Sequence, residues 1–351
     1  MAILGAPFGV VMRWIFELVQ NYGLALLLFT ILSRLVMIPL TIKQTKSSAK
    51  MAIVQPEIQE IQRKYAGNRQ KINEEMMALY GKVGYNPTAG CLPMLVQMVI
   101  LFGIIDVIFR PMTHILNLTA SVIDRANDIT TWLIAEGLMD ASARAQQSIE
   151  LATLYAIDGG LVEYFHEIGP TYITSMQTFA GQMHFLGTFN LMDTPSLEMN
   201  ALMLIPILSG VTSVLLTMAT MGQMGAQAPG MPNMKIMMWM MPVFSTVFTF
   251  MIPAGVGIYW IYANVIGYIQ AKILKIFYNP KEMAEKHRAQ MEEIKERERQ
   301  ERKAAKERAK ERGETDDIES MSKKEQNRRR LAEARKRDAE KYGDSYHEDD
   351  D

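Results

Sequence analysis

The sequence predicts an all-α polytopic membrane protein with five transmembrane helices around a hydrophilic groove open to the cytoplasm, and a cytoplasmic two-helix hairpin. Five largely apolar runs are long enough to cross a bilayer as helices. Lysine and arginine gather in two segments, 41–91 and 276–351, and residues 41–91 carry apolar positions at helical spacing. The mean hydropathy of +0.00 is therefore the average of apolar spans and charged segments.

Residues 1–22 predict an amphipathic helix lying in the membrane interface. Val10, Trp14 and Leu18 recur at helical spacing, whereas Arg13 and Glu17 lie on another face. A loosely packed apolar arm is the alternative. The segment has no basic n-region, so no cleavable signal is expected.

The five expected spans follow at residues 23–40, 92–109, 201–220, 236–252 and 253–275. The charges of the loops predict their orientation, since cytoplasmic loops are rich in lysine and arginine. Residues 41–91 carry eight such residues, whereas residues 110–200 carry three against ten acidic residues. This places the N-terminus and 110–200 outside the cell and the tail 276–351 in the cytoplasm.

Four segments outside the spans have distinct patterns. In the cytoplasmic segment 41–91, Ile58 and Ile61 begin one apolar stripe and Ile72 and Met76 another, with a break between them, so we expect an antiparallel helical hairpin. Whether it receives a partner stays open. The loop 221–235 is rich in methionine, which suits an adaptable apolar surface or ordinary packing.

The charged tail 276–351 alternates basic and acidic residues, which is typical of a solvated helix or disorder. Its basic stretch KKEQNRRRLAEARKRDAEK is suited to docking on ribosomal RNA or anionic lipid, or simply keeps the tail soluble. The external segment 110–200 suggests a small helical subdomain of open role. Its histidines lack the i, i+4 spacing of a helical metal site, so we expect scattered surface histidines and no metal or cofactor.

Arg34 lies inside the first apolar run, where an unpaired guanidinium costs about 2.5–3.5 kcal/mol on insertion scales. It lies roughly 9 Å from the cytoplasmic edge of the span at about 1.5 Å per residue. From there it either snorkels to the interface or faces a wet cavity. Asp106 differs from it in depth by roughly 12 Å or more and has Arg110 at i+4, so no intramembrane acid pairs with Arg34.

Other polar residues are distributed over the remaining spans and suit either bonds between helices or one wet groove with Arg34. They are Gln97, Ser209, Thr212, Ser213, Thr217, Thr246, Thr249, Asn264 and Gln270. No phosphate loop, zinc-protease motif or nucleophile elbow occurs in the sequence. Two other functions are possible alternatives for such a chain. A transporter predicts an inverted repeat and a polar path through the bilayer. An intramembrane enzyme needs a set of catalytic residues within the spans.

Four ordered stretches resemble the YidC-type membrane-protein insertases over most of residues 20–275, except 112–182. They read NYGLALLLFTILSRLVMIPLTIKQTKSSAKM, QPEIQEIQRKYAGNRQKINEEMMALYGKVGYNPTAGCLPMLVQM, FLGTFNLMDTPS with LIPILSGVTSV, and MMPVFSTVFTFMIPAGVGIYWIYANVIGYIQ. The resemblance implies five spans and a positively charged groove closed toward the outside. Arg34 falls on the groove arginine and Trp260 on a groove aromatic. Thr217 stands where many relatives carry a glutamine, which puts that contact in doubt.

By this resemblance the chain is an insertase and not an enzyme, working without nucleotide hydrolysis in a bacterial plasma membrane of Gram-positive-like type. The large external domain that Gram-negative members carry before the first span is not expected, and neither is a lipoprotein cysteine near the N-terminus. Its implied partners are nascent membrane-protein clients, the ribosome, the general secretion channel, the signal recognition machinery and the lipid bilayer. The expected client-binding groove is Arg34, Gln97, Ser213, Thr217, Trp260 and Asn264, and the expected apolar client slide is Ile207, Val211, Val214, Ile258 and Tyr262.

Overall fold

The computed structural model describes residues 2–85, 88–139, 148–220 and 234–278, together with isolated helical positions between 282 and 307. The chain divides into two units, 1–285 and 286–351, and every element described below belongs to the first. The expected methionine-rich loop lies almost entirely outside the described residues, and the basic stretch of the tail lies wholly outside them. The described part is almost entirely helical, with one two-stranded hairpin.

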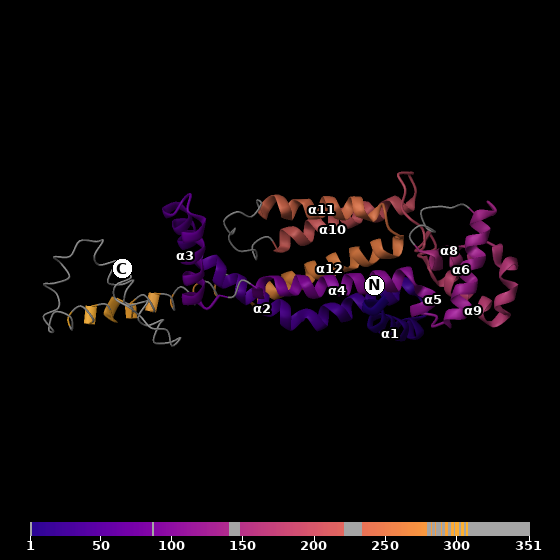
Figure 1. Ribbon diagram of the computed structural model, residues 1–351, viewed down its shortest axis with the longest axis horizontal. Coiled ribbons are helices and arrows are strands. Elements are labelled where there is room, and N and C mark those ends of the chain that lie inside the picture. The colour runs from indigo at the N-terminus through magenta and orange to yellow at the C-terminus, as the bar shows by residue number, and fades with distance from the viewer. Residues whose placement is uncertain are drawn as a thin grey trace, which may run out of the picture. The chain divides into compact units, whose positions relative to one another are not determined.

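The long helices lie side by side (Figure 1), and five of them cover most residues of the expected spans. They are α2 (Tyr22–Lys64), α4 (Thr88–Phe109), α10 (Leu204–Thr220), α11 (Met234–Thr249) and α12 (Ala254–Phe277). Helix α12 packs on α10 and α2, α10 packs on α11, and α2 packs on α4. Within the described residues, three segments are long and apolar enough to cross a membrane: Tyr22–Ser48, Leu92–Phe109 and Ala201–Thr220. The protein is thus a helical membrane protein with several spans.

Helix α2 runs 43 residues without interruption, through Pro39 and Pro56, so the first span and the first arm of the hairpin are one helix. Its distal half packs against α3 (Arg69–Val83) around a small apolar core of its own. That core comprises Met51, Val54, Ile58, Ile72, Met76, Leu79 and Tyr80. Gly67 in the connecting turn has a φ of +90°, a conformation that glycine adopts without steric cost. The two apolar stripes of the sequence therefore face each other.

The N-terminal helix α1 (Ala2–Val19) packs against α2 and α4. It buries Met12 and Phe16, whereas Val10, Trp14 and Leu18 are exposed on its other side. Two glycines at i, i+4 spacing let α1 approach α4 and the turn that follows it. A Cβ on Gly5 would overlap the carboxylate of Asp106, and one on Gly9 would lie 2.6 Å from the His114 ring.

Residues 111–203 fold into a subdomain of short elements next to one end of the long helices (Figure 1). These are α5 (Pro111–His114), α6 (Ala120–Ala135), α8 (Ile149–Asp158), η1 (Leu161–Ile168), α9 (Pro170–Gln182), β1 (His184–Phe185), β2 (Phe189–Asn190) and η2 (Ala201–Met203). The two strands pair antiparallel, with Phe185 opposite Phe189. The buried side chains of α6, α8, η1 and α9 belong to the same apolar core as the long helices.

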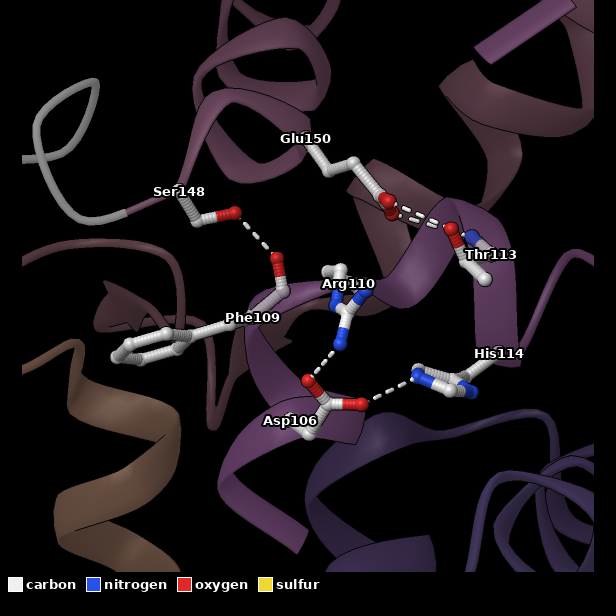
Figure 2. A network of polar contacts seen from close by, with 7 residues as sticks. All are labelled: Asp106, Phe109, Arg110, Thr113, His114, Ser148 and Glu150. Carbon is white, nitrogen blue, oxygen red and sulfur yellow. Dashed lines mark hydrogen bonds and ion pairs between the residues drawn. The ribbon is translucent and has the colours of Figure 1, made fainter. Parts of the chain in front are cut away.

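A polar network joins α4 to this subdomain (Figure 2). Arg110 donates to the carboxylate of Asp106, which confirms the predicted i+4 pair. The other Asp106 oxygen lies 2.8 Å from Nε2 of His114. The Ser148 hydroxyl donates to the backbone oxygen of Phe109, at the end of α4.

Glu150 completes this network from α8. Its carboxylate accepts bonds from the Thr113 amide, at 3.1 Å, and from the Thr113 hydroxyl, at 2.6 Å (Figure 2). Its side chain is buried, and this burial raises the pKa of Glu150 against the opposing effect of the bonds from Thr113. A buried carboxyl group thus links α5 to α8 within the subdomain.

The prediction of scattered surface histidines is wrong for His114. Its side chain is buried and contacts Asp106, because the chain turns at Arg110 and brings α5 back over the end of α4. His184 also has a carboxylate neighbour, with Nε2 2.9 Å from Asp158. Among the described residues, no group of three or more potential ligands is placed to hold a metal ion.

Candidate functional site

Arg34 lies on α2 and reaches across to α12. Its Nη2 donates a hydrogen bond of 2.8 Å to the backbone oxygen of Ala263, and its side chain is half-buried. Gly267, one turn further along α12, makes room for it, because a Cβ there would lie 3.3 Å from the same nitrogen. A guanidinium has five N–H donors, and this bond occupies one of them. The carbonyl satisfies a donor but carries no charge that would neutralise the arginine.

A cavity of about 250 Å³ opens beside Arg34 between α2, α4, α10 and α12. Its polar lining consists of Arg34, Thr41, Gln44, Gln97, Thr220 and Gln270, and of the described lining residues none is acidic. The apolar part of the wall includes Met37, Leu216 and Leu274. The site is therefore a small polar cavity with one positive charge, set among apolar helices.

Gln97 connects this wall to a buried tyrosine. Its side chain lies near the hydroxyl of Tyr259 on α12, and Tyr259 in turn lies near Arg34. Tyr259 is almost fully buried. Arg34, Gln97 and Tyr259 thus form one cluster across α2, α4 and α12.

Arg34 also borders a second, apolar cavity of about 380 Å³ between α2 and α12. Isoleucines from both helices form half of its wall, among them Ile31, Ile38, Ile266 and Ile269. The guanidinium therefore lies where a polar cavity meets an apolar surface. A ligand there would have to be partly polar and partly apolar.

Of the expected groove residues, Gln97 shares the cavity with Arg34, and the other four do not line it. Ser213, Trp260 and Asn264 are buried, and Thr217 is partly buried. Trp260 packs against Phe248 of α11, with ring centroids 5.8 Å apart. From α10, the residues that line the cavity are Leu216 and Thr220.

Asn264 instead belongs to a hydrogen-bonded network that joins α10, α11 and α12. Its side-chain amide donates to the Thr212 hydroxyl at 3.2 Å. Ser209 lies 2.6 Å from the Ser245 hydroxyl and accepts a bond of 3.1 Å from Thr249. Such bonds between spans are worth about 0.6 kcal/mol each on average. These polar residues hold helices together, which is one of the two roles that the sequence left open.

The expected apolar slide is divided between the surface and the core. Ile207 and Val211 of α10 are exposed, at 46% and 51%. Val214 and Tyr262 are partly buried, and Ile258 is buried in the core. The exposed part of the expected slide therefore lies on α10, where Leu208, Leu215 and Met218 extend it.

The cavity beside Arg34 also includes three residues that were not expected in the groove from the sequence: Thr41, Gln44 and Thr220. Thr41 and Gln44 follow Arg34 by seven and ten residues on α2, so helical periodicity places all three on one face. That signal was present in the sequence. Thr220 ends α10 and reaches the cavity through the way α10 packs on α12.

Comparison with known proteins identifies the relatives of this chain. The profile of a family described as "60Kd inner membrane protein" matches residues 14–283. A protein of Treponema denticola named "Membrane protein insertase YidC" is 45% identical over 93 residues. The alignment covers 26% of this chain and 16% of that protein.

Two further relatives show the same pattern. "Membrane protein insertase MisCA" of Bacillus subtilis is 48% identical over 95 residues, which cover 26% of this chain and 36% of that protein. "Membrane protein insertase YidC" of Clostridium perfringens is 48% identical over 90 residues, covering 26% of this chain and 38% of that protein. The alignments thus span well under half of each relative.

Proposed function

This chain belongs to the 60Kd inner membrane protein family, which includes the YidC insertases, and we propose that it inserts client transmembrane segments into the lipid bilayer. The cavity beside Arg34 would hold a polar or acidic part of the client while the apolar part enters lipid. The whole process would need no nucleotide hydrolysis, and the protein would act as an insertase and folding helper and not as an enzyme.

The observation that carries this proposal is the uncompensated charge of Arg34. Its guanidinium donates to a neutral carbonyl, and the described walls of its cavity contain no carboxylate. A cation in a low-dielectric setting strongly favours a nearby anion. An acidic residue of a client would supply that anion, which lowers the cost of moving a polar segment part-way into the membrane.

The apolar cavity and the exposed face of α10 support the second half of the proposal. The cavity of about 380 Å³ adjoins Arg34 on its apolar side. Ile207 and Val211 lie on the exposed face of α10, which offers a client helix an apolar surface. Since lipid tails are as apolar as leucine, the client gains most by withdrawing its helix from water, at about 25 cal/mol per Å² of apolar surface.

The topology completes the proposal. We propose five spans from the five apolar runs, and an external N-terminus and a cytoplasmic tail from the charge distribution of the loops. The hairpin of distal α2 and α3 would then lie in the cytoplasm, where it would receive clients or their targeting factors. The ribosome, the signal recognition machinery and the secretion channel are proposed as partners on that side.

Reconstitution tests this function directly. Purified protein in liposomes is expected to insert a single-span client with an acidic translocated end, and Arg34→Ala is expected to reduce insertion. A client whose acidic residues are changed to amides should insert about equally well with both proteins. Arg34→Lys should retain part of the activity, because it keeps the charge and loses the planar donor geometry.

Arg125→Ala is the matched control, because it removes one exposed arginine from residues 111–203 and Arg125 lines neither of the two cavities beside Arg34. Full activity of Arg34→Ala with every acidic client would remove the arginine from the mechanism. Passage of small anions through the same liposomes at a rate that depends on Arg34 would indicate a transporter instead.

A further inference from the structure

A cleft of about 630 Å³ lies on the subdomain formed by residues 111–203, between α6 and η1. Helix α6 lines it with residues that recur at helical spacing and so share one face: Arg125, Asp128, Ile129 and Trp132. The opposite side is lined by Glu163, Tyr164, His166 and Glu167 of η1. Ligand sites usually have volumes of about 300–1,000 Å³, so the cleft has the size of a binding site.

Two aromatic rings form one end of the cleft. The centroids of Trp132 and Tyr164 lie 5.9 Å apart and the rings are inclined by 49°. Trp132 is 47% exposed, although indole is a large apolar group that proteins tend to bury. Inclined, accessible rings present π-faces, which attract cations within about 6 Å.

An ion pair forms the other end. Arg125 donates through Nε to the Glu167 carboxylate at 3.0 Å and makes a second bond through Nη2. This pairing holds the pKa of Glu167 below its usual range. Glu167 therefore remains charged and engaged with Arg125.

Asp128 and Glu163 supply the remaining carboxylates. Neither carboxylate accepts a hydrogen bond from the part of the chain that the structure describes, although Asp128 also interacts electrostatically with Arg125. The cleft thus has three carboxylates, one guanidinium and the imidazole of His166. The acidic groups outnumber the basic ones, so the surplus charge of the cleft is negative.

We propose that this cleft binds an arginine side chain presented by a polypeptide segment. The guanidinium would stack on the Trp132 ring and donate to the carboxylates of Asp128 and Glu163. Arginine fits better than lysine, because its planar group stacks on aromatic rings and pairs with carboxylates through two parallel bonds. The cleft uses no residue of the Arg34 cavity, so this site is independent of the proposed insertion function.

Calorimetric titration of the whole protein tests the proposal. The protein is embedded in nanodiscs of phosphatidylcholine, which has no net charge and does not itself attract the probe. The probe is a capped pentapeptide with arginine at its centre and glycine elsewhere. Binding is expected to weaken at least about tenfold when citrulline replaces the arginine, because citrulline keeps the shape and loses the charge.

Variants of the cleft locate the binding. Trp132→Ala is expected to weaken it about 2- to 30-fold, and Trp132→Phe, which keeps a ring in case alanine disturbs folding, should weaken it less. Asp128→Asn combined with Glu163→Gln should weaken it further and reduce its dependence on salt. Asp124→Asn is the control on the same helix, because Asp124 is exposed and lines a different cavity.

Three results would overturn the proposal. In the first, the citrulline peptide binds as tightly as the arginine peptide. In the second, both the Trp132→Phe and the carboxylate variants bind the arginine peptide as tightly as the original protein. In the third, the cleft binds a neutral oligosaccharide in place of the peptide. Arg34→Ala should leave the peptide affinity unchanged. Peptide binding that persists in a protein without insertion activity would therefore still support this site.

Discussion

Replacing Asp106 with alanine is expected to destabilise the fold by about 3–5 kcal/mol, the usual cost of breaking a buried ion pair from one side. Asp106 is 5% exposed and its carboxylate contacts both Arg110 and His114 (Figure 2). Its removal leaves two basic side chains without their acceptor next to Gly5 of α1. Three segments therefore lose one shared contact: α1, the end of α4 and α5.

The expected stability loss is large enough to measure by thermal unfolding in nanodiscs. At about 2–4 °C per kcal/mol, the midpoint should fall by about 6–20 °C. Asp106→Asn should cost less, since the amide still accepts one bond and loses only the charge. Asp124→Asn serves as the exposed control and should change the midpoint very little.

A double-mutant cycle separates the contact with His114 from general damage. Asp106→Asn and His114→Gln should show a coupling energy of about 0.5 kcal/mol or more, as expected for two residues in contact. Additive effects would show that the two side chains do not interact. An Asp106→Ala protein as stable as the original would refute the whole account of this network.

Further predictions concern three other parts of the structure. Burial raises the pKa of Glu150, so its contribution to stability is complete below the ordinary carboxyl pKa and is lost as pH rises through the raised pKa. Glu150→Gln should flatten this part of a pH series of unfolding midpoints. An unchanged profile would contradict this role of Glu150. Ile58→Ala should destabilise the hairpin by about 2–5 kcal/mol and speed proteolysis at its turn. Met77 is 63% exposed on the same hairpin, so Met77→Ala should do neither. Equal proteolysis of the two variants would argue against the hairpin core. A Cβ at Gly210 would overlap the Thr246 hydroxyl. Gly210→Val should therefore force α10 and α11 apart and lower the unfolding midpoint. An unchanged midpoint would show that the packing of these two helices is loose.

The hairpin shows what the sequence predicts well. Its two apolar stripes, the break between them and the glycine of the turn are all local features. Helical periodicity translates such features into packing, because residues three or four apart share a face. The same rule places Thr41 and Gln44 on the face of Arg34, although that inference requires α2 to continue beyond the expected end of the span.

His114 and Asn264 show where local rules stop. His114 follows Asp106 by eight residues, but a helix end and a turn lie between them, so the spacing rules of a single helix do not apply. Asn264 lies on the same helix as Gly267 and Ala263, which adjoin Arg34, but its side chain points to α10. Which of these faces meets which neighbour depends on the rotation of α12 in the bundle, and that is decided by contacts distant in sequence.

Asn264 and Arg34 differ in how the protein satisfies their polar groups. The polar residues around Asn264 satisfy one another within the protein, so they stabilise the packing of α10, α11 and α12 without offering a site to a ligand. Arg34 has a neutral carbonyl partner and a polar cavity at its side. Burying a charge whose attraction is not repaid within the protein costs stability. An anion from elsewhere would offset that cost, and under the proposed function an acidic client segment would supply it.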